Sequence, residues 1–400
     1  MRIGVYPGRH KPETGGGYAF PSRVVSGLLR TAGESPHQFV ILGARDGTCD
    51  VPGNVSFCEM RLSRWRQLRF GLARKGLLPR GVIVRDGIKH EVFYAEGEMI
   101  LSMGFDLLWF LVPYIPTMEV PYLITLWDLQ HRINPFFPEV SAGGIWGARE
   151  KGYSETLRRA MGIVTGTAQG GGDAERFYQI PEERIFVNPY PSPDIEQPLS
   201  RSALDGIMKK HGLSAPFLFY PAQLWAHKNH VRLFEGVRLL KTEWNLSFQV
   251  VLSGAAKCNV RHLMDMAGHF GIAEQIRNLG FVSHEDMGGL YQNAFALVFP
   301  TLCGPDNLPP LEAFSSGCPV VASDIPGARE QLGDAALFFD PLNPRELAKA
   351  VATLRGSEAL RGELIARGYA IAKNRTVEQY LRNIYEILDG VSGVRCCWGN

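Results

Sequence analysis

The chain has 400 residues, of which 45% are hydrophobic and 20% are charged, and its formal net charge is +2 at pH 7. This length exceeds what one ordinary core supports, so two domains are expected, and the near-neutral charge argues against nucleic acid as a partner. Seven cysteines without a CxxC pair or a His/Cys ligand spacing favour reduced thiols and a cytoplasmic location. No run of about 18 apolar residues occurs, which argues against a membrane-spanning helix. Residues 1–6 lead directly into a glycine loop rather than into a secretory leader.

The first half alternates short apolar runs with helical patterns, which is typical of a parallel sheet covered by helices. A strand at 2–6 is followed by a glycine-rich loop and by a helix that we expect to begin at a Ser22 cap. Further strands are expected at 39–43, 106–111, 122–127, 162–167 and 184–187. The proline-rich segment 188–198 is expected to link two domains.

The second half repeats this alternation. Strands are expected at 217–220, 248–253, 275–279, 296–300 and 318–323, and helices at 228–240, 262–270 and 287–293. The stretch GPDNLPPLEAF (304–314) predicts a loop and then a helix. Pro309 and Pro310 suit a first helical turn, and Gly317 suits the left-handed position after a helix. A final helix from 376 to 388 carries an apolar stripe, which needs a partner surface.

Residues 61–89 form a basic segment in which cations alternate with large apolar side chains and only one acid, Asp86, occurs. Two interpretations stay open. The segment is either a solvated helix face and loop, or a surface that meets anionic lipid or an anionic acceptor, because basic side chains flanking apolar ones favour an interface. The second interpretation would place the protein peripherally at the inner face of the membrane.

Two polar segments follow the expected first strands of the two halves, where doubly wound sheets bind ligands. Gly15–Gly17 lets a ligand approach the backbone, and the helix after it offers free N–H groups to an anion. The segment is not GxGxxG, so a dinucleotide fingerprint is not supported. The segment YPAQLWAHKNH presents Gln223, His227 and Lys228. The lysine either neutralises a phosphate as a point charge or is simply solvated.

The third polar segment is the loop and helix at 304–314. Asn307 and Leu308 can turn backbone N–H groups outward, and Glu312 can accept two hydrogen bonds from a vicinal diol. Alternatively, Glu312 is a first-turn acid that favours the helix dipole.

Together, these motifs resemble the nucleotide-sugar-binding domain of family-4 glycosyltransferases of GT-B fold. The resemblance is carried by the Lys228 loop, by GFVSHEDMGGLYQNA (280–294) and by FPTLCGPDNLPPLEAFSSGCPVVAS (299–323), with weaker similarity through the first half. It implies an α/β protein with two Rossmann-like doubly wound domains that face each other across a cleft. The implied parts are an acceptor-binding domain at 1–194, a nucleotide-sugar-binding domain at 195–375, and a helix and tail at 376–400 that cross back to the first domain.

The resemblance also implies roles for individual residues. The implied donor-binding set is Gly16, Gly17, Gln223, Lys228, Phe281, Val282, Asp306, Asn307, Leu308 and Glu312. Glu312 matches the family glutamate that binds the ribose diol. Gly304 stands where the first glutamate of the family's Glu-x7-Glu motif is expected, so Asp306 or Asn307 is expected to substitute. Gln223 replaces the family's diphosphate arginine, which leaves more of the leaving-group charge to Lys228 and to helix N–H groups.

A third replacement concerns the cleft histidine of the family, whose position is taken here by Trp127. The implied catalytic set is therefore Lys228, Asp128 and His131. His131 either takes over the task of the replaced histidine or is an ordinary solvated or core residue.

The resemblance implies a retaining glycosyltransferase that moves a hexose-type sugar from a GDP- or UDP-sugar to a glycan or lipid-linked acceptor. No Asp-x-Asp metal pair occurs, so no metal or other cofactor is expected. The three replacements keep an alternative open, a non-catalytic GT-B protein that binds a nucleotide sugar or partners an active subunit. A GT-B epimerase or phosphorylase is a further alternative.

Overall fold

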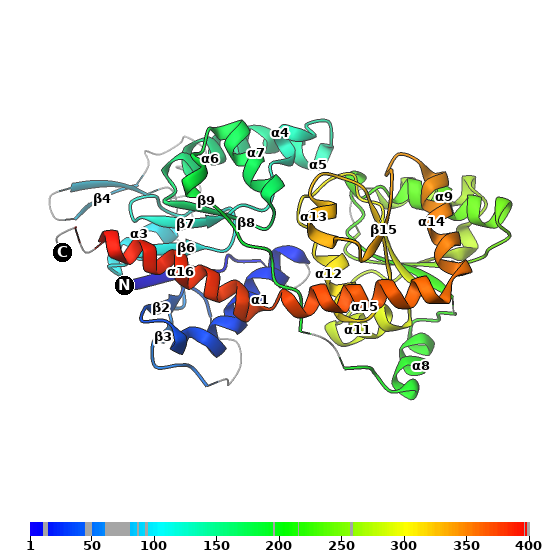
Figure 1. Ribbon diagram of the computed structural model, residues 1–400. Coiled ribbons are helices and arrows are strands. Elements are labelled where there is room, and N and C mark those ends of the chain that lie inside the picture. The colour runs from blue at the N-terminus through cyan, green and yellow to red at the C-terminus, as the bar shows by residue number, and fades with distance from the viewer. Residues whose placement is uncertain are drawn as a thin grey trace.

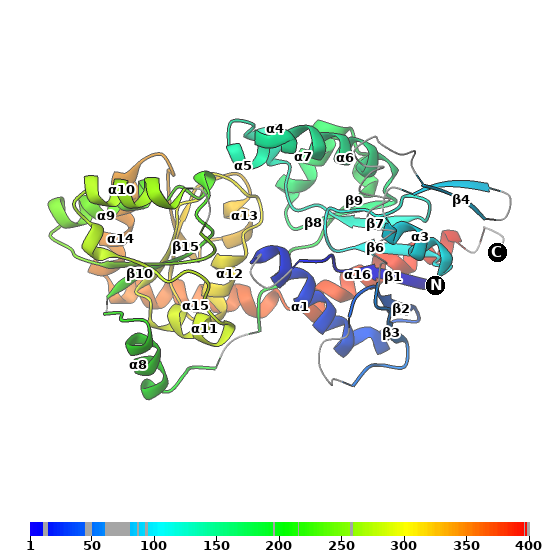
Figure 2. The ribbon, with the colours of Figure 1, turned by 180° about the vertical axis from the view of Figure 1, so that it is seen from behind.

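The computed structural model describes residues 1–10, 15–44, 50–60, 81–85, 88–92, 95–194, 197–214, 216–256, 259–395 and 397. Two α/β domains lie side by side, and the last two long helices run from the second domain back along the first (Figures 1 and 2). Most of the basic segment, residues 61–80, lies outside the described residues. Within the described ranges, no helix has the length and apolar character needed to cross a bilayer.

The N-terminal domain is built on a seven-stranded parallel sheet in the order β3-β2-β1-β6-β7-β8-β9. Its strands are β1 (Arg2–Tyr6), β2 (Gln38–Ile41), β3 (Val55–Phe57), β6 (Leu107–Phe110), β7 (Tyr122–Thr125), β8 (Gly162–Thr165) and β9 (Ile185–Val187). Its helices are α1 (Gly16–Thr31), α3 (Ala95–Ser102), α4 (Gln130–Ile133), α5 (Pro138–Ser141), α6 (Ile145–Arg159) and α7 (Ala168–Tyr178). A hairpin of β4 (Gly81–Arg85) and β5 (Ile88–Val92) lies apart from the sheet. The central strands are apolar runs because helices cover both faces of the sheet.

The C-terminal domain has a six-stranded parallel sheet in the order β12-β11-β10-β13-β14-β15, which is the 3-2-1-4-5-6 order of a doubly wound fold. Its strands are β10 (Phe217–Pro221), β11 (Gln249–Ser253), β12 (Ile276–Asn278), β13 (Ala296–Phe299), β14 (Val320–Ser323) and β15 (Ala336–Phe339). Its helices are α8 (Arg201–Lys210), α9 (His230–Glu243), α10 (Val260–His269), α11 (His284–Asn293), α12 (Leu308–Ser315), α13 (Ala328–Leu332), α14 (Pro344–Gly356) and α15 (Glu358–Asn374).

The last helix, α16 (Val377–Arg395), packs on α1 of the N-terminal domain (Figure 1). Its buried stripe consists of Val377, Tyr380, Leu381, Ile384, Tyr385 and Leu388. The two helices approach most closely at Gly27, where an added Cβ would lie 2.5 Å from a methyl of Val377 and 2.9 Å from one of Leu381. The predicted crossover of the final helix is therefore confirmed.

The predicted strands recur close to their expected positions, but the start of α1 was placed wrongly. The helix begins at Gly16, directly after Gly15 at φ 70°, and Ser22 lies inside it rather than at its cap. Pro21 also lies within the helix, in its second turn, where the proline interrupts one backbone hydrogen bond without ending the helix.

Candidate active site between the two domains

A cavity of about 1110 Å³ lies between the two sheets, and both domains line it. The N-terminal wall comes from the start of α1 and from the residues after β7. The C-terminal wall comes from the loops after β10, β11, β12 and β13. These loops follow the carboxyl ends of parallel strands, which is where doubly wound sheets bind ligands. The candidate residues that line it are Gly16, Gly17, Asp128, Gln223, Lys228, Phe281, Val282, Asp306, Asn307, Leu308 and Glu312.

Lys228 ends a short 3-10 helix, η5 (Ala226–Lys228), in the loop after β10. The hydroxyl of Tyr220 donates to its carbonyl at 2.8 Å. The next residue, Asn229, adopts a left-handed conformation at φ 59°, and its amide donates to the carbonyls of Pro300 at 2.9 Å and Pro341 at 2.8 Å. The loop is therefore fixed before any ligand arrives.

The Lys228 ammonium group has a surrounding that suits an anionic ligand. Its Nζ lies 5.4 Å from the ring centroid of Phe299, and it has no ion-pair partner among the described residues. Burial lowers the pKa of Lys228, whereas Cys303, Asp128 and Glu139 act in the opposite direction. A half-buried cation that lines the cavity without an ion-pair partner among the described residues fits a phosphate, whose charge would compensate the desolvation.

Glu312 is the fifth residue of α12, and its carboxylate faces the same cavity. The hydroxyl of Tyr291 donates to Oε2 at 2.9 Å, which orients the carboxylate and leaves Oε1 without a hydrogen bond to the described residues. The first turn of α12 contains no acidic residue, so the alternative of a first-turn acid is wrong. An oriented carboxylate with one free oxygen can accept hydrogen bonds from a diol.

Arg23 of α1 enters the cavity from the opposite domain. Its guanidinium donates to the carbonyl of Pro191 at 2.8 Å. Burial lowers the pKa of Arg23, and the carboxylates of Glu312 and Asp194 act to raise it. The sequence offers no motif for this residue, which only the packing of the two domains brings toward Glu312.

The loop before α12 has a conformation that requires glycine. Gly304 has φ 111°, a region that side chains rarely adopt, and an added Cβ would lie 3.0 Å from the amide of Asn307. That amide donates to the Gly304 carbonyl at 2.7 Å. The backbone N–H of Asn307 donates to Oε1 of Gln331 at 3.1 Å, so it does not turn outward as predicted. The side chain of Leu308 instead approaches the glycine loop, 3.5 Å from an added Cβ on Gly16.

The carboxylate of Asp306 reaches across to the N-terminal domain. It lies 3.5 Å from the hydroxyl of Thr167, and an added Cβ on Gly166 would lie 2.4 Å from its Oδ1. Burial and the nearby Glu330 raise the pKa of Asp306 to about 7. The side chain is thus engaged in an interdomain contact rather than presented freely to a donor sugar.

Glu330 makes a second contact between the domains. Its carboxylate accepts the backbone N–H groups of Ala168 at 2.6 Å and Gln169 at 3.3 Å, at the start of α7. Arg375 donates to the Glu330 carbonyl at 3.2 Å. A carboxylate at a helix N-terminus is favourable because free N–H groups gather there.

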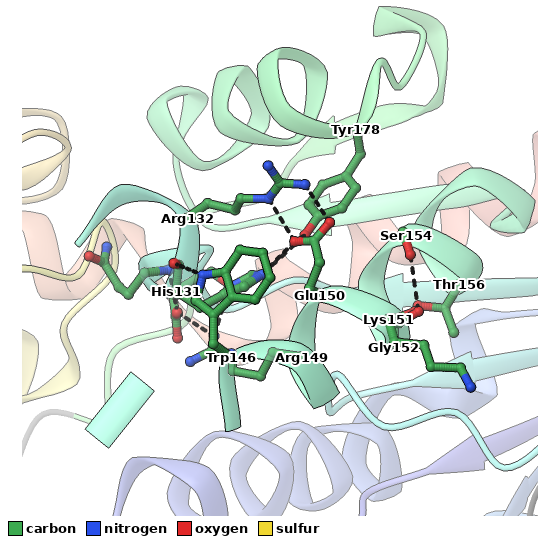
Figure 3. Close-up of polar contacts among 12 residues, drawn as sticks. His131, Arg132, Trp146, Arg149, Glu150, Lys151, Gly152, Ser154, Thr156 and Tyr178 are labelled. Carbon is green, nitrogen blue, oxygen red and sulfur yellow. Dashed lines mark hydrogen bonds and ion pairs between the residues drawn. The ribbon is translucent and has the colours of Figure 1, made fainter. Parts of the chain in front are cut away.

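His131 does not line the cavity, and its ring lies instead beside Glu150 and Tyr178 within the N-terminal domain (Figure 3). The side chain is fully buried on α4. Its Nε2 lies 3.1 Å from the Tyr178 hydroxyl and 3.3 Å from a carboxylate oxygen of Glu150, which also pairs with Arg132. Burial lowers the pKa of His131. The predicted place of this histidine in the cleft is wrong, because the ring faces α6 and α7.

Asp128 and Trp127 do border the cavity. Oδ1 of Asp128 accepts hydrogen bonds from the guanidinium of Arg149 at 2.5 Å and from the backbone N–H of Gln130 at 2.9 Å. These contacts hold the carboxylate at the end of β7. Nε1 of Trp127 is buried and has no hydrogen-bond partner among the described residues.

Residues 206–371 match the family model described as "Glycosyl transferases group 1". The O-antigen chain mannosyltransferase B of Escherichia coli is 28% identical over 243 residues, which are 60% of this chain and 64% of that protein. The O-antigen chain mannosyltransferase RfbU of Salmonella typhimurium is 28% identical over 196 residues, which are 49% of this chain and 51% of that protein. The chain thus spans less than two thirds of the length of these relatives.

Solved structures with the same arrangement cover nearly the whole chain. WaaG, a glycosyltransferase involved in lipopolysaccharide biosynthesis, superposes with a TM-score of 0.67 at 15% identity over 96% of this chain and 99% of WaaG. Anabaena HepE, solved in complex with UDP-glucose, superposes with a TM-score of 0.66 at 16% identity over 98% of this chain and 100% of HepE. The chain has the GT-B fold, and its residues 206–371 are similar to the glycosyl transferases group 1 family.

Within this GT-B fold, the structure gathers every candidate residue except His131 around one cavity. Phe281 is 58% exposed at its rim, and Val282 beside it is buried. Sequence reasoning missed Arg23, which lines the same cavity, and Glu139, which contacts His227 of the C-terminal domain. No local motif marks either residue, because their partners are distant in the sequence.

Proposed function

We propose that the protein is a retaining glycosyltransferase that moves a hexosyl group from a nucleotide-sugar donor to a hydroxyl of a glycan or lipid-linked acceptor. The observation that carries the proposal is that Lys228 and Glu312 line the same cavity at the carboxyl ends of the strands. Lys228 supplies an unpaired cation for a diphosphate, and Glu312 supplies an oriented carboxylate for a ribose diol. Both relatives named above carry mannosyltransferase names, so mannose is the sugar to test first.

The chemistry follows from where charge develops. As the bond between the anomeric carbon and the diphosphate breaks, its electron pair leaves with the diphosphate, while an acceptor oxygen bonds to the same face of the sugar. Lys228 stands where this negative charge would grow, and one such preorganised donor contributes about 2.7–4 kcal/mol to the transition state. We propose that no metal is required, and activity in excess EDTA checks this.

The same proposal includes the nucleobase site, the contact with a membrane and the location of the protein. The nucleobase of the donor is expected to lie near Phe281 and Val282, as the resemblance implies. Contact of the basic segment 61–89 with an anionic membrane, and a cytoplasmic location, stay predictions. The GDP- or UDP- form of the donor is decided by experiment.

Thermal-shift titration with GDP-mannose, UDP-glucose and their free nucleotides tests donor binding, because a ligand that binds only the folded state raises its stability. One nucleotide sugar should raise the melting temperature of the wild type. Glu312→Gln should weaken its binding about tenfold or more, since hydrogen bonds to a charged group contribute ~1.5–3 kcal/mol. Glu363→Gln, a matched change at an α15 side chain that is 59% exposed, should leave binding unchanged. Binding that survives Glu312→Gln intact would contradict the ribose role, and binding without turnover would favour a non-catalytic protein.

A further inference from the structure

A carboxylate of the N-terminal domain reaches the loop that carries Lys228. Glu139 lies on α5, at the end of its domain that faces the C-terminal domain (Figure 1). Its Oε1 accepts the backbone N–H of His227 at 2.8 Å and also accepts from Nδ1 of the same histidine. The side chains of Glu139 and His227 are only 5% and 17% exposed. The pair therefore joins the two domains at the edge of the cavity.

The surroundings of this pair are packed rather than incidental. Phe137 and Val140, on either side of Glu139, form a small apolar cluster with Cys303 of the other domain. The ring of Phe137 lies 6.0 Å from that of His227. The backbone N–H of Leu302 donates to the His227 carbonyl at 2.8 Å, which ties the loop that carries His227 to the segment after β13.

The protonation state of the pair follows from its surroundings. Burial disfavours the charged form of Glu139, but the hydrogen bonds from His227 outweigh it and lower the pKa of the carboxyl group. Burial and the neighbouring Lys228 lower the pKa of His227 to about 4. A carboxylate can only accept hydrogen bonds, so Nδ1 carries the imidazole proton and Nε2 presents a lone pair.

The lone pair of Nε2 is available to a ligand. His227 lines the cavity beside Lys228, and Nε2 has no hydrogen-bond partner among the described residues. A neutral nitrogen with a lone pair accepts a hydrogen bond from a hydroxyl, whereas it would repel the oxygens of a diphosphate. The site therefore suits an acceptor hydroxyl next to the cation that suits the leaving group.

We propose that His227 is the general base of the transfer and that Glu139 is the positioning residue that fixes its tautomer and ring orientation. This inference rests on the proposed function. As the acceptor oxygen bonds to the anomeric carbon, its proton passes to Nε2, and the electron pair of the breaking bond leaves with the diphosphate. The imidazolium is then stabilised by the Glu139 carboxylate and releases its proton to solvent, which restores the resting state.

Donor binding is expected to strengthen this base. The charged groups that act on the imidazole are Lys228, Glu139 and Asp128, and Lys228 is the one that disfavours protonation. A diphosphate bound at Lys228 cancels that effect, so the basicity of Nε2 rises when the donor is in place. Before the donor binds, Lys228 thus keeps the His227 imidazole unprotonated.

His227→Asn separates the chemical role from the interdomain contact. The asparagine amide can still donate to Glu139, and the backbone N–H contact is unchanged, but the Nε2 lone pair is lost. The assay uses whichever of GDP-mannose and UDP-glucose the wild type turns over, with transfer to octyl mannoside and to water measured in parallel. Turnover at saturating donor should fall about 100-fold or more, as expected for loss of a general base. Donor affinity should stay within twofold of the wild-type value, as should turnover by the control His269→Asn, at an exposed position at the end of α10.

Glu139→Gln supplies a readout that a purely structural contact would not give. The glutamine oxygen still accepts from Nδ1, but the negative charge that raises the pKa of His227 is lost. The acidic limb of the pH–rate profile should therefore move to lower pH, with turnover reduced about tenfold.

Two results would overturn the inference: turnover by His227→Asn within twofold of wild type, or an unmoved acidic limb in Glu139→Gln. If the wild type neither binds nor turns over a nucleotide sugar, the proposed function itself is wrong, and the inference that rests on it is wrong as well.

Discussion

Replacing Asp306 by asparagine tests whether a half-buried carboxylate between the domains makes the stability of the folded protein depend on pH. Burial and Glu330 raise the pKa of Asp306 from 3.8 to about 7, so the folded protein binds this proton more tightly than the unfolded chain does. This carboxyl group therefore contributes stability that is fully present below about pH 4 and is lost as the pH rises to about 7, with no further change from this group above that range. Asparagine has the same shape and cannot ionise, so Asp306→Asn should remove this loss.

The size of the effect follows from the shift. Each pKa unit corresponds to about 1.4 kcal/mol, and a rise of roughly three units gives a ceiling of ~4 kcal/mol. Domain opening and water entry relieve part of this, so a gain of about 2–4 kcal/mol at pH 8 is expected for Asp306→Asn. Below pH 4 the variant and the wild type should be equally stable.

Thermal unfolding between pH 4 and pH 8.5 measures this difference. The melting temperature of Asp306→Asn should match the wild type at low pH and exceed it increasingly up to pH 8, by several degrees. Asp334→Asn removes a carboxylate that is 80% exposed in the same domain, and its curve should follow the wild type. A difference between Asp306→Asn and wild type that does not grow with pH would refute the argument.

Three further substitutions test separate parts of the structure. Lys228→Met should lower turnover about 100- to 1000-fold, because one charge-stabilising donor contributes ~2.7–4 kcal/mol. The melting temperature should hold or rise, because a half-buried cation without an ion-pair partner among the described residues is removed. Unchanged turnover at saturating donor would exclude the diphosphate role. Gly304→Glu restores the family's glutamate but strains a backbone at φ 111°. Denaturant unfolding should therefore show a loss of about 1–3 kcal/mol for Gly304→Glu and also for Gly304→Ala, and wild-type stability of both variants would contradict the strain. Gly27→Leu should lower the free energy of unfolding by about 1–3 kcal/mol, because it disrupts the contact of α1 with α16. Val377→Ala should partly restore the stability of this variant. Equal stability of Gly27→Leu and wild type would mean that the two helices do not depend on their close approach.

The sequence predicts the sheets well because parallel strands buried on both faces are continuous apolar runs. The runs at Leu107–Phe110 and Tyr122–Thr125 illustrate this, since every residue in them is buried. Ligand loops are also predictable, because they follow the carboxyl ends of such strands. This reasoning places Lys228 and Glu312 at the cavity without knowledge of the domain arrangement.

Side-chain direction is what the sequence does not determine. His131 follows β7 by only a few residues, yet the short helix α4 turns its ring into the core. The N–H of Asn307 is captured by Gln331, which is 24 residues away in the chain. Glu139 and His227 are separated by 88 residues and belong to different domains, so no local pattern could pair them.

The anomeric configuration of the released sugar tests the central claim most directly. Purified protein is incubated with GDP-mannose or UDP-glucose in excess EDTA, and NMR follows the sugar transferred to water or to octyl mannoside before free sugar can mutarotate. Glycosyl transfer with retention predicts that the α-configured donor yields α-configured product, and that Glu312→Gln forms this product much more slowly at subsaturating donor. Formation of the β anomer would contradict retention, and donor binding without any released or transferred sugar would contradict the assignment as a glycosyltransferase.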